Sequence, residues 1–130
     1  ELEALNKPAP DTDNWREVMS NYGQADDPID SFSQAGYLAA KVATDAMLSI
    51  DGEVTREKVF TAFKGITNVR TDMLCAPWYF GTGDRHQANH MGRVALLTET
   101  GFDVQTDCFL TQDEDLADIL ALEKAGGLVN

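Results

Sequence analysis

The chain has 130 residues and a mass of 14.2 kDa, which is the size of one ordinary domain and too small for two independent cores. Its 10 basic and 22 acidic residues give a net charge of −12, which disfavours nucleic acids and anionic lipid surfaces as partners. Hydrophobic residues make up 43% of the sequence and charged residues 25%, a globular composition that excludes a disordered chain, and no apolar run reaches the about 20 residues of a membrane span.

The opening segment, residues 1–10, predicts neither a helix nor a secretory signal. Pro8 and Pro10 interrupt a continuous helix, and the basic, apolar and small-residue order of a signal peptide is missing. Because residue 1 is Glu and not an initiator Met, we expect the chain to be processed or excised from a longer protein.

The first predicted helix lies within residues 13–23. Apolar side chains recur there at i, i+3, i+4 and i+7 and share one helical face, namely Trp15, Val18, Met19 and Tyr22. An Asp or Thr residue before this segment is the candidate N-cap, and Gly23 is placed to end the helix. We interpret the apolar stripe as core packing and not as a groove for a partner.

The strongest helical pattern runs from Phe32 to Ile50. Small and apolar residues follow one face, and polar residues such as Lys41 and Asp45 occupy the other. The apolar stripe consists of Ala35, Ala39, Val42, Ala43, Ala46, Met47 and Ile50. Since this stripe has little bulk, we predict a core-packing helix that approaches another element closely.

A third, shorter helix is predicted between Thr55 and Gly65. A turn at Asp51-Gly52 precedes it, Thr55 is a suitable N-cap, and Gly65 is suited to the C-terminal end. Its apolar face is formed by Val59, Phe60, Ala62 and Phe63.

After residue 70 the pattern changes from helical to extended. Residues 73–80 are apolar and aromatic, and Pro77 among them indicates an edge or irregular strand, followed by a turn at residues 81–84. Residues 93–98 and 102–109 flank Glu99-Thr100-Gly101 and predict a β-hairpin with one solvent-exposed face.

The last predicted element is a C-terminal helix. Thr111 and Glu114 have the spacing of a capping box, and Gly126-Gly127 would end the helix. Its apolar side chains are Leu116, Ile119 and Leu120.

Two histidines form the sharpest candidate for catalytic chemistry. His86 and His90 lie four residues apart, a spacing that on a helix presents two imidazoles to one metal ion. A zinc hydrolase also needs a general-base Glu and a third ligand, whereas residues 87–89 are Gln, Ala and Asn. We therefore interpret the pair as polar groups of a loop and predict no metal site, no cofactor and no catalytic residue.

The two cysteines are predicted to pair. Cys75 and Cys108 lie at the ends of segments that flank the same hairpin, and the chain between them is long enough to fold back in an antiparallel direction. A bridge that closes a loop of this length stabilises the fold by roughly 3–4 kcal/mol in the chain-entropy model. A disulfide also favours an extracytoplasmic location.

A set of features in fixed order carries a resemblance to a known family. They are a helix that ends at Tyr22-Gly23, a helix with Gly36, Tyr37, Ala39 and Ala40, a short helix from Thr55 to Phe63, and strands beside a histidine-bearing turn from His86 to His90. Together they make the region from Asn14 to Cys108 resemble the C-terminal part of the type I periplasmic substrate-binding proteins. The most similar group is the branched-chain amino acid receptors of ABC transporters.

The resemblance implies an α/β fold with two lobes that are joined by hinge strands and close on a solute. Residues 1–70 would supply late helices of one lobe, residues 71–110 the strand and hairpin region with the last hinge crossing, and residues 111–130 a C-terminal helix and tail. The implied protein is not an enzyme. It is a periplasmic receptor that serves uptake of branched-chain amino acids or related small carboxylates, with an ABC permease as partner.

The resemblance places the residues that hold the solute mainly in segments upstream of this chain. Within the chain, Tyr37 and His90 are candidate ligand contacts by position alone. An acidic, free-standing protein–protein interaction module is the alternative, because the predicted helices have apolar faces without a visible parallel sheet to cover them. We expect these faces to need more chain, or self-association, for a complete core.

Overall fold

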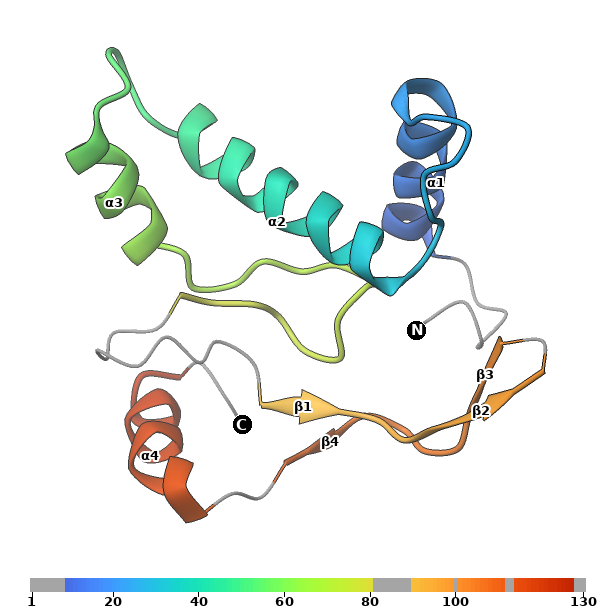
Figure 1. The fold of residues 1–130 in the computed structure, drawn as a ribbon. Coiled ribbons are helices and arrows are strands. Elements are labelled where there is room, and N and C mark those ends of the chain that lie inside the picture. The colour runs from blue at the N-terminus through green and yellow to red at the C-terminus, as the bar shows by residue number, and fades with distance from the viewer. Residues whose placement is uncertain (1–8, 81–89, 100, 112–113, 128–130) are drawn as a thin grey trace.

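The computed structural model describes residues 9–80, 90–99, 101–111 and 114–127. The elements follow in the order α1 (Pro10–Tyr22), α2 (Ser31–Leu48), α3 (Arg56–Lys64), β1 (Met91–Gly92), β2 (Ala95–Thr98), β3 (Gly101–Val104), β4 (Phe109–Leu110), a 3-10 turn (Glu114–Leu116) and α4 (Ala117–Ala125). Figure 1 shows α1, α2 and α3 on one side, the strand pairs and α4 on the other, and the chain that follows α3 running between them.

Helix α1 confirms the first predicted helix but begins earlier, at Pro10. Proline is tolerated at the first helical position because its missing N–H would have no intrahelical partner there. The predicted Asp or Thr N-cap is wrong, since the N-cap residue is Ala9 and offers no side-chain acceptor. Gly23 ends the helix as predicted, and its N–H donates to the carbonyl of Met19 at 2.9 Å.

Helix α2 confirms the longest predicted helix and begins with a reciprocal cap. The Asp30 carboxylate accepts from the backbone N–H groups of Phe32 and Ser33 at 3.0 and 2.9 Å. The backbone N–H of Asp30 in turn donates to the Ser33 hydroxyl at 3.1 Å. These bonds satisfy backbone donors that the first turn of a helix leaves without partners.

The predicted core stripe of α2 is only partly buried. Val42 and Ala46 are buried, whereas Ala35, Ala39 and Met47 are exposed. Val42 and Ala46 lie in the C-terminal half of α2, the helix contacts α3, and both residues line a groove together with Ala62 of α3. This neighbouring helix accounts for their burial.

Helix α3 has the ends that the sequence predicts. The Thr55 hydroxyl accepts from the backbone N–H of Lys58 at 3.3 Å, and Gly65 is the C-cap residue. Aromatic rings from the following segment pack beside it: the centroids of Phe63 and Phe80 are 5.9 Å apart in an edge-to-face arrangement. This contact ties α3 to residue 80.

Residues 73–80 do not form the predicted strand. Turns and bends occupy residues 72–76, and one antiparallel bridge joins Val69 to Trp78 through two backbone hydrogen bonds of 2.8 Å. Pro77 has no N–H and cannot donate to a strand ladder, which limits pairing to the residues beside it. The predicted turn at residues 81–84 lies outside the described residues.

The predicted hairpin is present but is divided into two short strand pairs. Strands β2 and β3 are antiparallel, with Ala95 opposite Val104 and Thr98 opposite Gly101. Strands β1 and β4 continue the ribbon, with Gly92 opposite Phe109.

Between these pairs, residues 93–94 lie opposite residues 105–108, so the second strand carries extra residues and bulges. The bulge interrupts the predicted alternation. The prediction that only one face of the hairpin is exposed to solvent is also wrong, because the side chains of Leu96, Leu97 and Phe102 are all exposed.

The C-terminal helix is confirmed, but its predicted capping box is wrong. The Thr111 hydroxyl donates to the carbonyl oxygen of His90 at 2.7 Å instead of capping the helix. A 3-10 turn precedes α4, whose N-cap residue, Leu116, offers no side-chain acceptor. Gly126 is the C-cap residue, and Gly127 follows with a φ of 71°, a left-handed conformation that suits glycine.

The buried core of the described residues is small. Its hydrophobic members are Trp15, Val42, Ala46 and Tyr79. Large apolar side chains remain on the surface, and Phe32 and Leu97 are 85% and 72% exposed. No helix in the described part of the chain combines the length and apolarity needed to cross a membrane. The mixture of helices and small antiparallel sheets is compatible with an α/β fold.

Candidate functional site

A junction between α1 and the loop after α3 fixes the position of the first helix. The Asp72 carboxylate accepts from the backbone N–H of Asp11 at 2.7 Å and from the N–H and hydroxyl of Thr12 at 3.1 and 2.8 Å. The backbone N–H of Asp72 donates back to the Asp11 carboxylate at 3.3 Å. Thr12 is fully buried. We call these three residues the α1 junction.

The α1 junction acts as a long-range N-cap. A carboxylate at a helix N-terminus satisfies orphan N–H groups and interacts favourably with the helix dipole. Because the Ala9 side chain has no hydrogen-bond acceptor, the acceptor comes from Asp72, which is 60 positions from Thr12 in the sequence. The junction therefore holds the loop at residue 72 against α1 and restricts where the following residues can lie.

Polar side chains also join α1 to α2. The Asn14 side-chain amide donates to the Tyr37 hydroxyl. One turn further along α2, the Lys41 ammonium donates to the Asp45 carboxylate at 2.6 Å. This hydrogen bond raises the pKa of Lys41 above its ordinary value of 10.5, so Lys41 is a fixed positive charge at neutral pH. A hydroxyl and an ammonium thus lie on neighbouring turns of one helix.

The candidate ligand contacts Tyr37 and His90 occupy different parts of the fold. Tyr37 is half-buried on α2, and its hydroxyl accepts a hydrogen bond from Asn14 of α1. His90 is buried before β1, and its carbonyl accepts from the N–H and the hydroxyl of Thr111, both at 2.7 Å. The structure therefore assigns Tyr37 to the helical side and His90 to the start of the strand ribbon.

One member of the predicted histidine pair lies among the described residues. His86 lies outside the described residues, and His90 directly precedes β1 and is not in a helix. Across the described ranges, no group of three or more His, Cys, Asp or Glu side chains is arranged to hold a metal ion.

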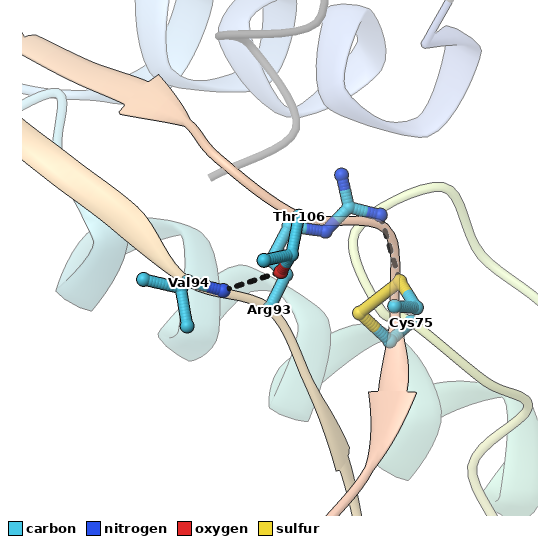
Figure 2. Close-up of a disulfide and its surroundings, with 5 residues drawn as sticks. Cys75, Arg93, Val94 and Thr106 are labelled. Carbon is cyan, nitrogen blue, oxygen red and sulfur yellow. Dashed lines mark hydrogen bonds between the residues drawn. A yellow bond between two sulfur atoms is a disulfide. The ribbon is translucent and has the colours of Figure 1, made fainter.

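The predicted disulfide is confirmed. The structure joins Cys75 of the loop after α3 to Cys108 of the strand bulge, with Cα atoms 5.6 Å apart. Figure 2 shows the Arg93 guanidinium directed at this bridge, and its Nη2 donates to Cys108 Sγ at 2.7 Å. Nearby, the Thr106 hydroxyl accepts from the backbone N–H of Val94 at 2.9 Å, which replaces a ladder hydrogen bond inside the bulge.

An open groove lies between α2, α3 and the segment after α3. Its volume is about 410 Å³. Its lining residues are Val42, Asp45, Ala46, Ser49, Ala62, Gly65, Ile66 and Val69. Most of these side chains are apolar or small, and the lining contains a carboxylate but no cation. A small carboxylate solute needs donors or a positive charge for its own carboxylate. The groove therefore suits apolar packing better than solute binding.

The sequence did not indicate the roles of three residues of this region, Asp72, Arg93 and Asn14. Asp72 caps a helix that is far away in the sequence, and no local spacing signals such a contact. The sequence places Arg93 only at the start of a predicted strand, because its partner Cys108 lies 15 residues further along the chain, on the opposite strand of the ribbon. Asn14 was likewise not singled out, because its partner Tyr37 lies on another helix.

The sequence comparisons decide the family. A family model described as periplasmic binding protein matches residues 3–101, which is most of the chain. The chain belongs to this family. The matched span covers α1, α2, α3, β1 and β2, and it ends before Cys108 and α4. No curated protein and no solved structure gives a significant match.

Family membership has direct consequences for function. Periplasmic binding proteins of the type I fold bind solutes outside the cytoplasm and are generally not enzymes. The match confirms the family that the sequence features indicated. The branched-chain amino acid group and the C-terminal placement within a two-lobed protein remain predictions.

Proposed function

We propose that this chain is the C-terminal portion of a two-lobed receptor that captures branched-chain amino acids or related small carboxylates and delivers them to an ABC permease. The observation that carries the proposal is the match to the periplasmic binding protein family over residues 3–101. Affinity in such a receptor arises from closure of the lobes around the solute and requires no covalent chemistry.

The exposed apolar surface supports a role within a larger lobe. Val42 and Ala46 are buried, while other parts of the same α2 face are open. Helices pack stably when such faces are covered by a sheet or by further helices. We assign residues 1–70 to the late helices of one lobe, residues 71–110 to the strand region with the last hinge crossing, and residues 111–130 to a C-terminal helix and tail.

Tyr37 is the better of the two proposed ligand contacts to test. Its hydroxyl oxygen accepts from Asn14, and the phenolic O–H can still donate to a carboxylate oxygen. Tyr37 is also half-buried, whereas His90 is 6% exposed and would have to become accessible before it could touch a solute. We propose Tyr37 as a donor to the solute and retain His90 as a second candidate.

The proposal also assigns a location and a partner. A Cys75–Cys108 disulfide persists in oxidising compartments and is rare in the cytosol, which supports a periplasmic location. The receptor would release its solute to a membrane permease. The net charge of −12 repels the phosphate backbone of nucleic acids and disfavours them as partners.

The test is a thermal-shift screen on the protein in the full length that its gene encodes. Leucine, isoleucine, valine and small carboxylates are added separately, with the D-amino acids as controls. We expect the L-enantiomers of one class to raise the melting temperature, because a ligand that binds only the folded state stabilises it. The 130-residue chain alone is expected to respond weakly or not at all. Absence of any stereospecific shift in the full-length protein would contradict the proposal.

A matched pair of variants tests Tyr37. Tyr37→Phe removes only the hydroxyl, and Tyr22→Phe removes the same group from a residue that is 81% exposed. We expect the first variant to weaken solute binding about tenfold, as loss of a hydrogen bond to a charged group does, and the second to leave binding unchanged. Equal affinity in both variants would remove Tyr37 from the site.

A second candidate function rests on the exposed apolar side chains of the strand ribbon. Leu96, Leu97 and Phe102 are each more than half exposed, as is Phe32 on α2. Such side chains are typical of a surface that another protein covers. Sedimentation of the full-length gene product over a range of concentrations tests this acidic interaction module, because further chain would cover the apolar faces of a receptor lobe. A concentration-dependent dimer would favour it, and a monomer at all concentrations would count against it.

A further inference from the structure

The two sulfur atoms of the Cys75–Cys108 bridge have different electrostatic surroundings. Arg93 Nη2 donates to Cys108 Sγ at 2.7 Å, and no hydrogen bond among the described residues reaches Cys75 Sγ. Both cysteines are half-buried and so remain accessible to a small reagent. Figure 2 shows the guanidinium on one side of the bridge only.

The Arg93 cation is held in place and is only weakly screened. Its Nε atom is enclosed by protein and has no acceptor among the described residues, and the side chain is half-buried. An enclosed charge acts more strongly on a neighbouring atom than an exposed one does. A guanidinium beside a sulfur stabilises the thiolate form of that sulfur.

The described acidic residues that lie close to the two cysteines in the sequence do not cancel this effect. Asp107 precedes Cys108, but it is exposed and therefore well screened by water. Asp72 on the loop that carries Cys75 is occupied by the backbone of α1 and by Thr12. Thus the hydrogen-bonded charge at the bridge is the positive charge of Arg93.

We propose that Cys75 is a site of mixed-disulfide formation with small thiols, and that Arg93 directs the exchange by stabilising Cys108 as the leaving thiolate. The thiolate of a small thiol attacks Cys75 Sγ, a new S–S bond forms there, and the Cys75–Cys108 bond breaks. The electron pair of the broken bond leaves with Cys108 Sγ. The sulfur of the small thiol is oxidised, Cys108 is reduced, and the proton of the small thiol goes to solvent. Exchange of this kind proceeds faster when the departing thiol is the better leaving group.

The structural consequence follows from the place of each cysteine in the fold. Cys75 lies on the loop that Asp72 anchors to α1, and Cys108 lies in the strand bulge. Exchange therefore leaves the small thiol on the helical side of the molecule and the free thiolate beside Arg93. It also removes the covalent link between these two parts of the structure.

The experiment uses the oxidised 130-residue chain with a small excess of reduced glutathione. Samples are quenched with acid, free thiols are blocked with N-ethylmaleimide, and the modified peptides are mapped by mass spectrometry. We expect glutathione on Cys75 and N-ethylmaleimide on Cys108 in at least about threefold excess over the reverse arrangement. Equal amounts of both arrangements, or glutathione mainly on Cys108, would overturn the proposal.

Variants of Arg93 test the cause of this preference. Arg93→Gln removes the charge and is expected to make the two arrangements equal and to slow exchange about threefold, whereas Arg93→Lys keeps the charge and the preference. Arg56→Gln, a change at an exposed position on α3, is the matched control and should behave as wild type. If Arg93→Gln keeps the full preference, the proposal fails.

A second measurement avoids any effect of Arg93 substitution on folding. The single-cysteine variants Cys75→Ser and Cys108→Ser each leave one free thiol, and the alkylation rates of these thiols at neutral pH are compared. The proposal predicts that the remaining Cys108 reacts at least about threefold faster than the remaining Cys75. Equal rates, or a faster Cys75, would overturn it.

Discussion

The α1 junction gives the sharpest prediction about stability. Replacing Asp72 with Ala removes the acceptor for two backbone N–H groups and for the Thr12 hydroxyl, at distances of 2.7, 3.1 and 2.8 Å. Loss of an N-cap acceptor costs about 0.5–2 kcal/mol. A buried hydroxyl without a partner costs about 1–3 kcal/mol, and Thr12 is 0% exposed. Since Asp72 itself is half-buried and water can replace part of the lost bonding, we expect a total of about 2 kcal/mol.

Urea unfolding followed by circular dichroism measures this free energy. With a typical urea slope, a loss of about 2 kcal/mol lowers the midpoint by about 1 M while the slope stays unchanged. Asp13→Ala is the control, because Asp13 is an exposed carboxylate in the same first turn and pairs with Arg16 at 3.5 Å. This control should cost about 0.5 kcal/mol or less.

A double-mutant cycle separates the junction from general damage to the loop. Thr12→Val removes the hydroxyl and keeps the shape of the side chain, so its effect and that of Asp72→Ala should overlap. We expect the double variant to be more stable than the sum of the single effects by at least about 0.5 kcal/mol. Full additivity, or a cost for Asp72→Ala no larger than that of Asp13→Ala, would refute the assignment of Asp72 as the cap of α1.

The other predictions concern the disulfide, the α2 cap and one ion pair. Replacing both Cys75 and Cys108 with Ala should lower the free energy of unfolding by roughly 3–4 kcal/mol, since the bridge spans a sequence separation of 33. Unchanged stability in urea would show that the bridge does not restrict the unfolded chain. Asp30→Ala should cost about 1 kcal/mol and lower helix content, whereas Asp30→Asn should retain most of the capping; equal losses in both would exclude the cap as the cause. The exposed pair of Lys41 and Asp45 should contribute no more than about 0.5 kcal/mol, and Lys41→Met measures it in low and high salt. Because the pKa of Lys41 is raised on folding, this contribution is fully present below pH 10.5 and is lost as pH rises through the folded pKa; a contribution that increases at higher pH would contradict the assignment.

Elements that depend on local sequence were predictable. Thr55 and Gly65 mark the ends of α3 because capping depends on residues within one turn of the helix. The β2–β3 hairpin was found from alternation around Gly101. The pairing of Cys75 with Cys108 followed from their positions beside the same ribbon.

Features that depend on contacts between distant residues were not predictable. The cap of α1 comes from Asp72, so the predicted local Asp or Thr cap is wrong. The bulge at residues 105–108 needs the pairing register on both sides of it, and periodicity alone could not place it. Thr111 has the spacing of a capping-box residue, but its hydroxyl bonds to His90 across the strand ribbon.

The candidate site was predictable only at the level of the family. The order of the Tyr22-Gly23 end, the Gly36-Tyr37 helix and the Thr55 helix indicated a periplasmic binding protein, and the family match over residues 3–101 confirms it. A solute pocket is assembled from groups that converge in space, and the described residues bring together one hydroxyl and one ammonium on α2. The identity of the solute therefore depends on residues that the pattern of this chain does not specify.

We propose that this chain belongs to a receptor that binds a branched-chain amino acid between two lobes. Isothermal titration calorimetry of the full-length gene product with L-leucine tests it most directly, with D-leucine titrated under the same conditions. We expect saturable binding of one L-leucine per chain and no heat of binding for D-leucine. An L-leucine titration without binding heat, in a protein shown to be folded, would contradict the branched-chain assignment.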